Sequence, residues 1–275
     1  MNENLHEKYG DIYNEKNTVE EALNRLIYVL SILRKECEWD KIQTHESLRI
    51  CMIEEAYEVC DAIDNENMNN LEEELGDVLL QVIFHSALAE ECSKFNLVTV
   101  MNRVCSKMIH RHPHVFLKES VKGIDKAIEK WENVKGKEQR DMSYGQRLVA
   151  IPKALPALIR SYKVQAKAAE AGFDWDDVSG AFQKVKEETI ELEQICCDDD
   201  KGKISEELVD FLFSVVNVSR FLKVNPEQAL NEASEKFVKR FVCMEEEAKE
   251  RGKTLEGMTL QEMDELWEVV KLKTQ

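Results

Sequence analysis

The chain has 275 residues, enough for two domains of ordinary size that each bury a core. Glycine (10) and proline (4) are scarce while Glu, Lys, Leu and Ala are plentiful, which favours helices and predicts an all-α fold. The net charge of −17 makes nucleic acid an unexpected partner, because binding that polyanion needs clustered Lys and Arg.

The sequence carries no signal for a membrane or for secretion. No apolar run approaches the length of a membrane span, and the first seventeen residues are polar and mixed in charge. The eight cysteines are scattered without a CxxC pair, so reduced, buried thiols are expected rather than disulfides or a zinc site. We therefore expect a cytoplasmic protein.

Helix signals begin at Thr18, which forms a capping box with Glu21 ahead of an apolar-periodic segment that reaches about Arg34. Residues 47–64 and 70–92 are rich enough in apolar side chains to be core helices. The histidines of the stretch 109–116 are expected in a structural turn after a helix, because Pro113 breaks helical spacing there.

The pattern loosens between about 138 and 170, where prolines and a glycine interrupt it, so an interdomain connection is predicted there. Further on, Asn225 and Pro226 open a helix to about Arg251, and Thr259 with Glu262 caps a last helix. The predicted division is a polar tail (1–17), an N-terminal module (18–137), a connecting segment (138–170) and a C-terminal module (171–275).

The two modules repeat one acidic pattern. The N-terminal half contains IEEAYEV and EELGDVLLQVIF, and the C-terminal half contains KEETIEL and EELVDFLFSVVN. A constant offset of 133 residues relates Glu55, Glu58, Glu74 and Asp77 to Glu188, Glu191, Glu207 and Asp210. Such collinearity indicates two related helical units.

The acidic residues predict a cation site. Positions i and i+3 share one face of a helix, so Glu188 lies beside Glu191, and Glu207 lies beside Asp210 on the next helix. Four carboxylates bordering a core cannot all remain ionised and unpaired, so either their pKa values rise or a cation joins them. Oxygen ligands alone favour Mg²⁺, or Mn²⁺, over zinc.

Basic residues accompany the second acidic set. Lys184 and Lys186 lie one helical turn or less before the pair Glu188 and Glu191. Lys203 lies one turn before Glu207, and Lys236 and Arg240 share one face of a later helix. A metal with converging cations is how proteins hold a polyphosphate. Trp267 is equally suited to stacking on a base or to filling the core.

These residues resemble the MazG-type nucleoside triphosphate pyrophosphohydrolases, whose signature is EExxE followed by ExxD. Both copies match: Glu54-Glu55-x-x-Glu58 with Glu74-x-x-Asp77, and Glu187-Glu188-x-x-Glu191 with Glu207-x-x-Asp210. Family-like stretches at 37–48, 111–116, 151–169, 172–178 and 235–241 extend the resemblance over almost the whole chain.

The resemblance implies Mg²⁺-dependent hydrolysis of an NTP or dNTP to NMP or dNMP and pyrophosphate by water activated at the metal. It also implies a homodimer in which each module forms four-helix-bundle packing. The implied metal ligands are Glu188, Glu191, Glu207 and Asp210, with a second cluster at Glu55, Glu58, Glu74 and Asp77. The implied nucleotide contacts are Lys184, Lys186, Glu187, Lys203, Glu206, Lys236, Arg240 and Trp267, and Glu187 is the candidate that positions or deprotonates the water.

The two copies are not equivalent. At the offset of 133, Lys184, Lys186 and Lys203 are replaced by Cys51, Ile53 and Asn70, so turnover is expected in the C-terminal module. The alternative is a non-enzymatic acidic helical protein that binds metal or a partner. A ferritin-like di-iron bundle is not expected, because it needs ExxH motifs on two helices, and the chain does not provide two.

Overall fold

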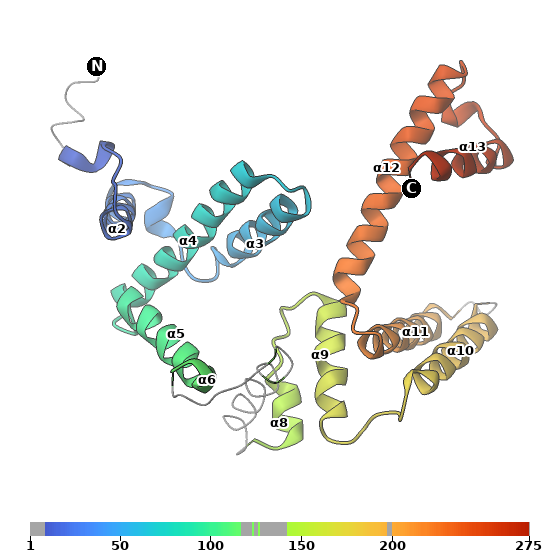
Figure 1. The fold of residues 1–275 in the computed structure, drawn as a ribbon, viewed down its shortest axis with the longest axis horizontal. Coiled ribbons are helices and arrows are strands. Elements are labelled where there is room, and N and C mark those ends of the chain that lie inside the picture. Colours follow the sequence, from blue (N-terminus) through green and yellow to red (C-terminus); the bar gives the residue numbers. More distant parts are fainter. Residues whose placement is uncertain (1–8, 117–122, 124–125, 127–141, 197–199, 275) are drawn as a thin grey trace. The chain divides into compact units, whose positions relative to one another are not determined.

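A computed structural model describes residues 9–116, 123, 126, 142–196 and 200–274 of the chain. These residues form helices and no strand, which confirms the predicted all-α fold (Figure 1). Their contacts divide the chain into unit 1, Met1–Lys135, and unit 2, Gly136–Gln275. The predicted boundary at 137/138 lies outside the described residues.

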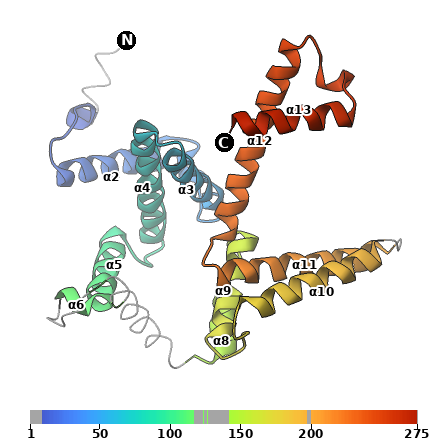
Figure 2. The ribbon, with the colours of Figure 1, turned by 45° about the vertical axis from the view of Figure 1, so that its right-hand side comes forward.

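Unit 1 contains two long helices that pack side by side, α3 and α4 (Figures 1 and 2). Its described elements are η1 (Gly10–Tyr13), α2 (Val19–Glu36), η2 (Asp40–Ile42), α3 (Arg49–Asp64), α4 (Met68–Glu91), α5 (Leu97–Arg111) and α6 (Pro113–Phe116). The helices predicted from 18, 47 and 70 therefore exist, with ends within about two residues of those expected.

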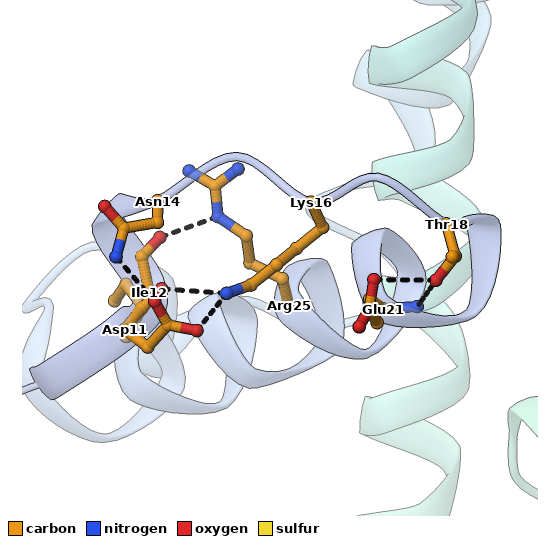
Figure 3. Close-up of polar contacts among 7 residues, drawn as sticks. All are labelled: Asp11, Ile12, Asn14, Lys16, Thr18, Glu21 and Arg25. Atoms are coloured by element: carbon orange, nitrogen blue, oxygen red, sulfur yellow. Dashed lines mark hydrogen bonds and ion pairs between the residues drawn. The ribbon is translucent and has the colours of Figure 1, made fainter.

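The start of α2 shows how local side chains define a helix end (Figure 3). Thr18 accepts a hydrogen bond from the backbone N–H of Glu21, and its hydroxyl lies 2.8 Å from the Glu21 carboxylate. Arg25, within α2, donates from Nε to the carbonyl oxygen of Ile12, which precedes the helix, at 2.6 Å. Ile12, within the predicted tail, is thus hydrogen-bonded to α2.

The hydrophobic core of unit 1 joins α2 to α4. Leu30 from α2, Leu48 before α3, and Ile83, Phe84 and Leu88 from α4 form one buried cluster. Helix α4 is apolar along this stretch because it packs on α2, α3 and α5. At the end of α5, a ring nitrogen of His112 lies 2.7 Å from the carbonyl oxygen of Met108. The expected turn is limited to His112, because His110 lies within α5 and His114 within α6.

Unit 2 is built around helix α11, which packs against both α10 and α9. Its described elements are α8 (Tyr144–Val149), α9 (Ala157–Ala169), α10 (Val178–Ile195), α11 (Lys201–Phe221), α12 (Pro226–Glu250), η3 (Leu255–Gly257) and α13 (Leu260–Lys273). Helix α10 packs along α11 in both views, and α9 packs against α11 (Figures 1 and 2). The segment predicted as a connection thus contributes α9 to the packing of unit 2.

Helices α12 and α13 pack against each other around a small core of their own (Figure 1). Asn225 caps α12, with Pro226 at its first position, and Thr259 with Glu262 forms the capping box that starts α13. Gly252 has a φ of +72°, the left-handed conformation that ends a helix at low cost. The buried core consists of Met244, Ala248, Leu266 and Val270.

Many large apolar side chains remain exposed in the described residues. On α11 they include Leu208, Val209 and Leu212, at 43, 59 and 49 % exposure. The seven described cysteines are free thiols, but none is buried, so the expectation of buried thiols was wrong. None of the described helices is long and apolar enough to cross a membrane.

Candidate active site

The acidic site of unit 2 lies where α10 faces α11. Glu188 is buried on α10, and carboxylate oxygens of Glu187, Glu188 and Glu191 lie within 4.8 Å of one another. The helical spacing of i, i+3 and i+4 brings them to one side of α10. The sequence had predicted a cluster of Glu188, Glu191, Glu207 and Asp210, with Glu187 beside it. Among the described residues, the close group contains Glu187, Glu188 and Glu191 from α10 but not Glu207 or Asp210 from α11.

Electrostatics in this group reflect crowded negative charge. Desolvation of its carboxylate, followed by the charges of Glu188, Glu187 and Glu207, raises the pKa of the exposed Glu191, while Lys184 opposes the rise. Glu207 on α11 is therefore near enough for its charge to raise the pKa of a carboxylate on α10. Its neighbour Glu206 is exposed on α11.

Lys184 is the cation at the centre of the site. Its Nζ lies 2.6 Å from Glu187 Oε1 and 2.6 Å from Glu188 Oε1, and hydrogen bonds to these two carboxylates raise its pKa. The ammonium group therefore stays protonated at neutral pH. Lys186 and Lys203 are exposed, and the Nζ atom of Lys203 lies 4.0 Å from Oδ2 of Asp200.

A cavity of about 480 Å³ adjoins these charges, a size typical of small-molecule sites. Lys184, Glu188 and Asp210 line it together with side chains from α9, from the loop 170–177 and from α11. The other lining residues are Val164, Gln165, Ala168, Phe173, Asp174, Trp175, Phe213, Ser214, Asn217 and Arg220.

The loop that closes the cavity is held on α11 by Arg220. Its guanidinium forms an ion pair with Asp174 and donates from Nε to Asn217 Oδ1 at 2.8 Å. Gln165 connects α9 to α11 by donating from Nε2 to the carbonyl oxygen of Phe213 at 2.7 Å. The cavity walls are therefore fixed by interactions between segments about 50 residues apart.

Of the unit 2 residues implied by the resemblance, Lys184, Glu188 and Asp210 line the cavity and the others do not. Lys236 and Arg240 are on α12, Trp267 is on α13, and none of them lines the cavity. Trp267 packs against the α12–α13 core, with its ring centroid 5.1 Å from that of Phe237. Arg240 Nε lies 3.3 Å from the hydroxyl of Thr274.

Unit 1 repeats the acidic cluster, with Cys51, Ile53 and Asn70 at the positions of Lys184, Lys186 and Lys203. Carboxylate oxygens of Glu55, Glu58 and Glu74 lie within 4.8 Å of one another. Partial burial raises the pKa of Glu55, and the charge of Asp77 is the next largest cause. The four acids predicted from the repeat are thus close together on α3 and α4.

The sequence had not singled out most of the cavity residues. Gln165 and Phe173 fall in stretches noted as family-like, but no role followed from that. Asn217 and Arg220 could have been found by extending the 133-residue comparison, since the N-terminal copy has Phe84 and Ala87 at those positions.

Comparison with known proteins agrees with these motifs. The MazG nucleotide pyrophosphohydrolase domain is recognised over residues 43–116, which contain the first acidic copy. A relative from Thermotoga maritima, named nucleoside triphosphate pyrophosphohydrolase/pyrophosphatase MazG, is 42 % identical over 248 residues, covering 90 % of this chain and 94 % of the relative. The nucleoside triphosphate pyrophosphohydrolase of Escherichia coli K12 is 37 % identical over 254 residues, covering 90 and 97 %.

In two further comparisons, the matched region covers only part of one of the two proteins. The uncharacterized protein YabN of Bacillus subtilis is 44 % identical over 236 residues, which are 86 % of this chain and 48 % of that protein. A crystal structure of a mazG-related protein from Thermotoga maritima covers 41 % of this chain and 98 % of that one, with 27 % identity and a TM-score of 0.37. Since the two full-length relatives match nine-tenths of the sequence, the chain belongs to the MazG family of nucleotide pyrophosphohydrolases.

Proposed function

We propose that the chain hydrolyses nucleoside and deoxynucleoside triphosphates between the α- and β-phosphates, releasing the monophosphate and pyrophosphate, with Mg²⁺ as cofactor. One observation carries this proposal: a single cavity in unit 2 is lined by Lys184, Glu188 and Asp210 together with apolar and amide side chains. It can therefore hold a cation and a polyphosphate beside a less polar group. The names of the two full-length relatives support the reaction class.

The donor set fits a hard divalent cation. The proposed ligands Glu188, Glu191, Glu207 and Asp210 offer only carboxylate oxygens, which Mg²⁺ and Mn²⁺ prefer. Desolvation and the neighbouring charges of Glu188, Glu187 and Glu207 raise the pKa of Glu191, and a bound cation would favour its ionised form. When bound, Mg²⁺ would neutralise the developing charge of the leaving pyrophosphate and lower the pKa of water.

The side chains around this site have distinct tasks in the proposal. Lys184 holds phosphate oxygens with a permanently charged ammonium group, exchanging part of its contact with Glu187 and Glu188 for the substrate. Glu187, exposed and within reach of Glu188, is then free to orient water or accept its proton. The exposed Lys186, Lys203 and Glu206 would act at the periphery of the triphosphate.

A homodimer is part of the proposal. Exposed Leu208, Val209 and Leu212 on α11 form a set of apolar side chains that a second copy would cover. Since Lys236, Arg240 and Trp267 lie away from the cavity, their proposed nucleotide contacts require either a movement of α12 or a second copy. We place the enzyme in the cytoplasm, in keeping with the free thiols of the described cysteines.

Unit 1 is proposed to bind a metal without being the main centre of turnover. Its acids Glu55, Glu58, Glu74 and Asp77 match the proposed ligands of unit 2 and offer a second cation the same carboxylate oxygens. Cys51 stands at the position of Lys184, which removes the cation that contacts two carboxylates in unit 2.

Product analysis tests the reaction. The purified protein is incubated with each NTP and dNTP, with Mg²⁺ or with EDTA, and the expected products are the monophosphate and pyrophosphate only when metal is present. Orthophosphate and a diphosphate would show that a different bond is cleaved. No turnover of any nucleotide would favour the non-enzymatic alternative, an acidic helical metal-binding or interaction protein.

Matched substitutions test the assignment to unit 2. Glu188→Ala and Asp210→Ala are expected to abolish hydrolysis, because each removes a proposed ligand. Glu55→Ala, the counterpart of Glu188 in unit 1, is the control and should leave most of the activity. Equal losses from the two units would overturn the assignment.

A further inference from the structure

The cavity in unit 2 has side chains of two different kinds. Lys184, Glu188 and Asp210 are charged, as are the ion-paired Asp174 and Arg220. The side chains of Val164, Ala168, Phe173, Trp175 and Phe213 are apolar or aromatic. Asp210 and Asn217 lie seven residues apart on α11, which is about 10 Å along the helix axis. The amide group of Asn217 is therefore two helical turns away from the proposed metal ligand.

Hydrogen bonds determine which atom each cavity amide can offer. The Phe213 carbonyl oxygen can only accept, so Gln165 must present its NH₂ group there and keep Oε1 for another partner. Gln165 is 8 % exposed, and its buried Oε1 has no hydrogen-bond partner in the described part of the chain. Asn217 Oδ1 accepts from Arg220, which leaves its Nδ2 as the remaining donor.

A buried acceptor without a partner is costly, and a ligand that supplies a donor would relieve that cost. The pairing edge of a nucleobase presents donors beside acceptors, and its faces stack on aromatic rings. Trp175, 43 % exposed, and Phe173, 85 % exposed, are aromatic side chains of the cavity wall that can cover such a ring.

We propose that this part of the cavity is the base-recognition subsite, in which Gln165 accepts from the base, Asn217 donates to it, and Trp175 stacks on it. The inference rests on the proposed function and adds how the substrate is recognised. Because one free acceptor and one free donor satisfy any base that offers the complementary pair, the subsite selects for the presence of a pairing edge rather than for one base.

The residues of this subsite differ in unit 1. At the offset of 133, Asn217 corresponds to Phe84 and Arg220 to Ala87. Phe84 is 3 % exposed and belongs to the buried cluster with Leu30 and Leu48. A phenyl ring packed in a core leaves no amide donor there, so unit 1 keeps the acids and loses this base subsite.

Purine riboside triphosphate, which lacks the exocyclic amino group of ATP, tests the inference. In the wild-type protein with Mg²⁺, kcat/KM for ATP should exceed that for the analogue by about tenfold, the effect of one hydrogen bond to a buried group. Gln165→Met removes the acceptor with little change in volume and should bring the ratio close to one. A ratio that is the same in wild type and variant would overturn the inference.

Gln81→Met is the matched control. Gln81 on α4 is a buried glutamine of unit 1 whose Oε1 also has no partner among the described residues, and it should leave the ATP-to-analogue ratio unchanged. A change in that ratio equal to that of Gln165→Met would also contradict the inference. Circular dichroism verifies that both variants fold.

A binding measurement separates this inference from the proposed function. AMP should change the tryptophan fluorescence of the wild-type protein, and Trp175→Phe should remove most of that change while folding normally. Failure of every triphosphate to be hydrolysed would refute the proposed function, and AMP binding would then decide the subsite alone. The absence of any AMP-dependent change at Trp175 would refute the subsite, as would the same change in the Trp175→Phe variant.

Discussion

Gly180 on α10 offers a sharp test of how the cavity wall is packed. A Cβ atom added there would lie 2.4 Å from Cδ1 and 2.5 Å from Cγ of Trp175. Carbon atoms in favourable contact are about 3.5–4.0 Å apart, so Gly180→Ala forces the indole to move by roughly 1 Å or more. These atoms are close to the Trp175 backbone, so the loop must move with the ring.

The expected magnitude is a balance of two opposing effects. Replacing glycine by alanine in a helix stabilises it by at most about 1 kcal/mol. Overpacking of a filled site costs about 1–3 kcal/mol. Gly180→Ala should therefore be neutral to destabilising by about 2 kcal/mol, and the displaced Trp175 should raise the KM for nucleotides.

Gly76→Ala provides the control for helix propensity. Gly76 is also helical, in α4, and an added Cβ there would meet no atom within 4 Å. This variant should be stabilised by up to about 1 kcal/mol. The free energy of unfolding in urea and the tryptophan emission of the folded state are measured for both. Equal stabilisation of the two variants, with unchanged emission, would refute the packing assigned to Trp175.

Three further predictions concern helix ends and assembly. Glu262 bonds to Lys253 and to Thr259, which lowers its pKa from 4.5 to about 2, so its stabilising effect is present above pH 4.5 and is lost as the pH falls towards 2. Glu262→Gln should flatten the decline of the thermal midpoint over that pH window, and parallel declines would contradict this. Asn225→Ala removes the cap that binds two amides of α12 and should cost about 1 kcal/mol in urea unfolding, whereas an unchanged midpoint would show that the cap is dispensable. Leu212→Glu places a charge on the exposed apolar set of α11 and should shift the protein towards monomers in sedimentation, and an unaltered mass would rule out this face as the dimer contact.

The sequence alone determined the helical character and most helix ends. Caps such as Thr18, Asn225 and Thr259 act through bonds within a few residues, so their patterns can be recognised without tertiary structure. The acidic clusters were equally accessible, because i, i+3 spacing places Glu188 beside Glu191 on any regular helix. The repeat extended the same prediction to unit 1.

Only the tertiary structure decided what surrounds the acids. Gln165 and Phe213 meet across 48 residues of chain, and Arg220 reaches Asp174 across 46, so no local spacing predicts either pair. The packing of Phe84 into the core of unit 1, at the position of Asn217, likewise depends on which helices lie against α4. Local patterns carry the information for helix ends and helix faces, whereas cavity walls are set by contacts between distant segments, which depend on the packing of whole helices.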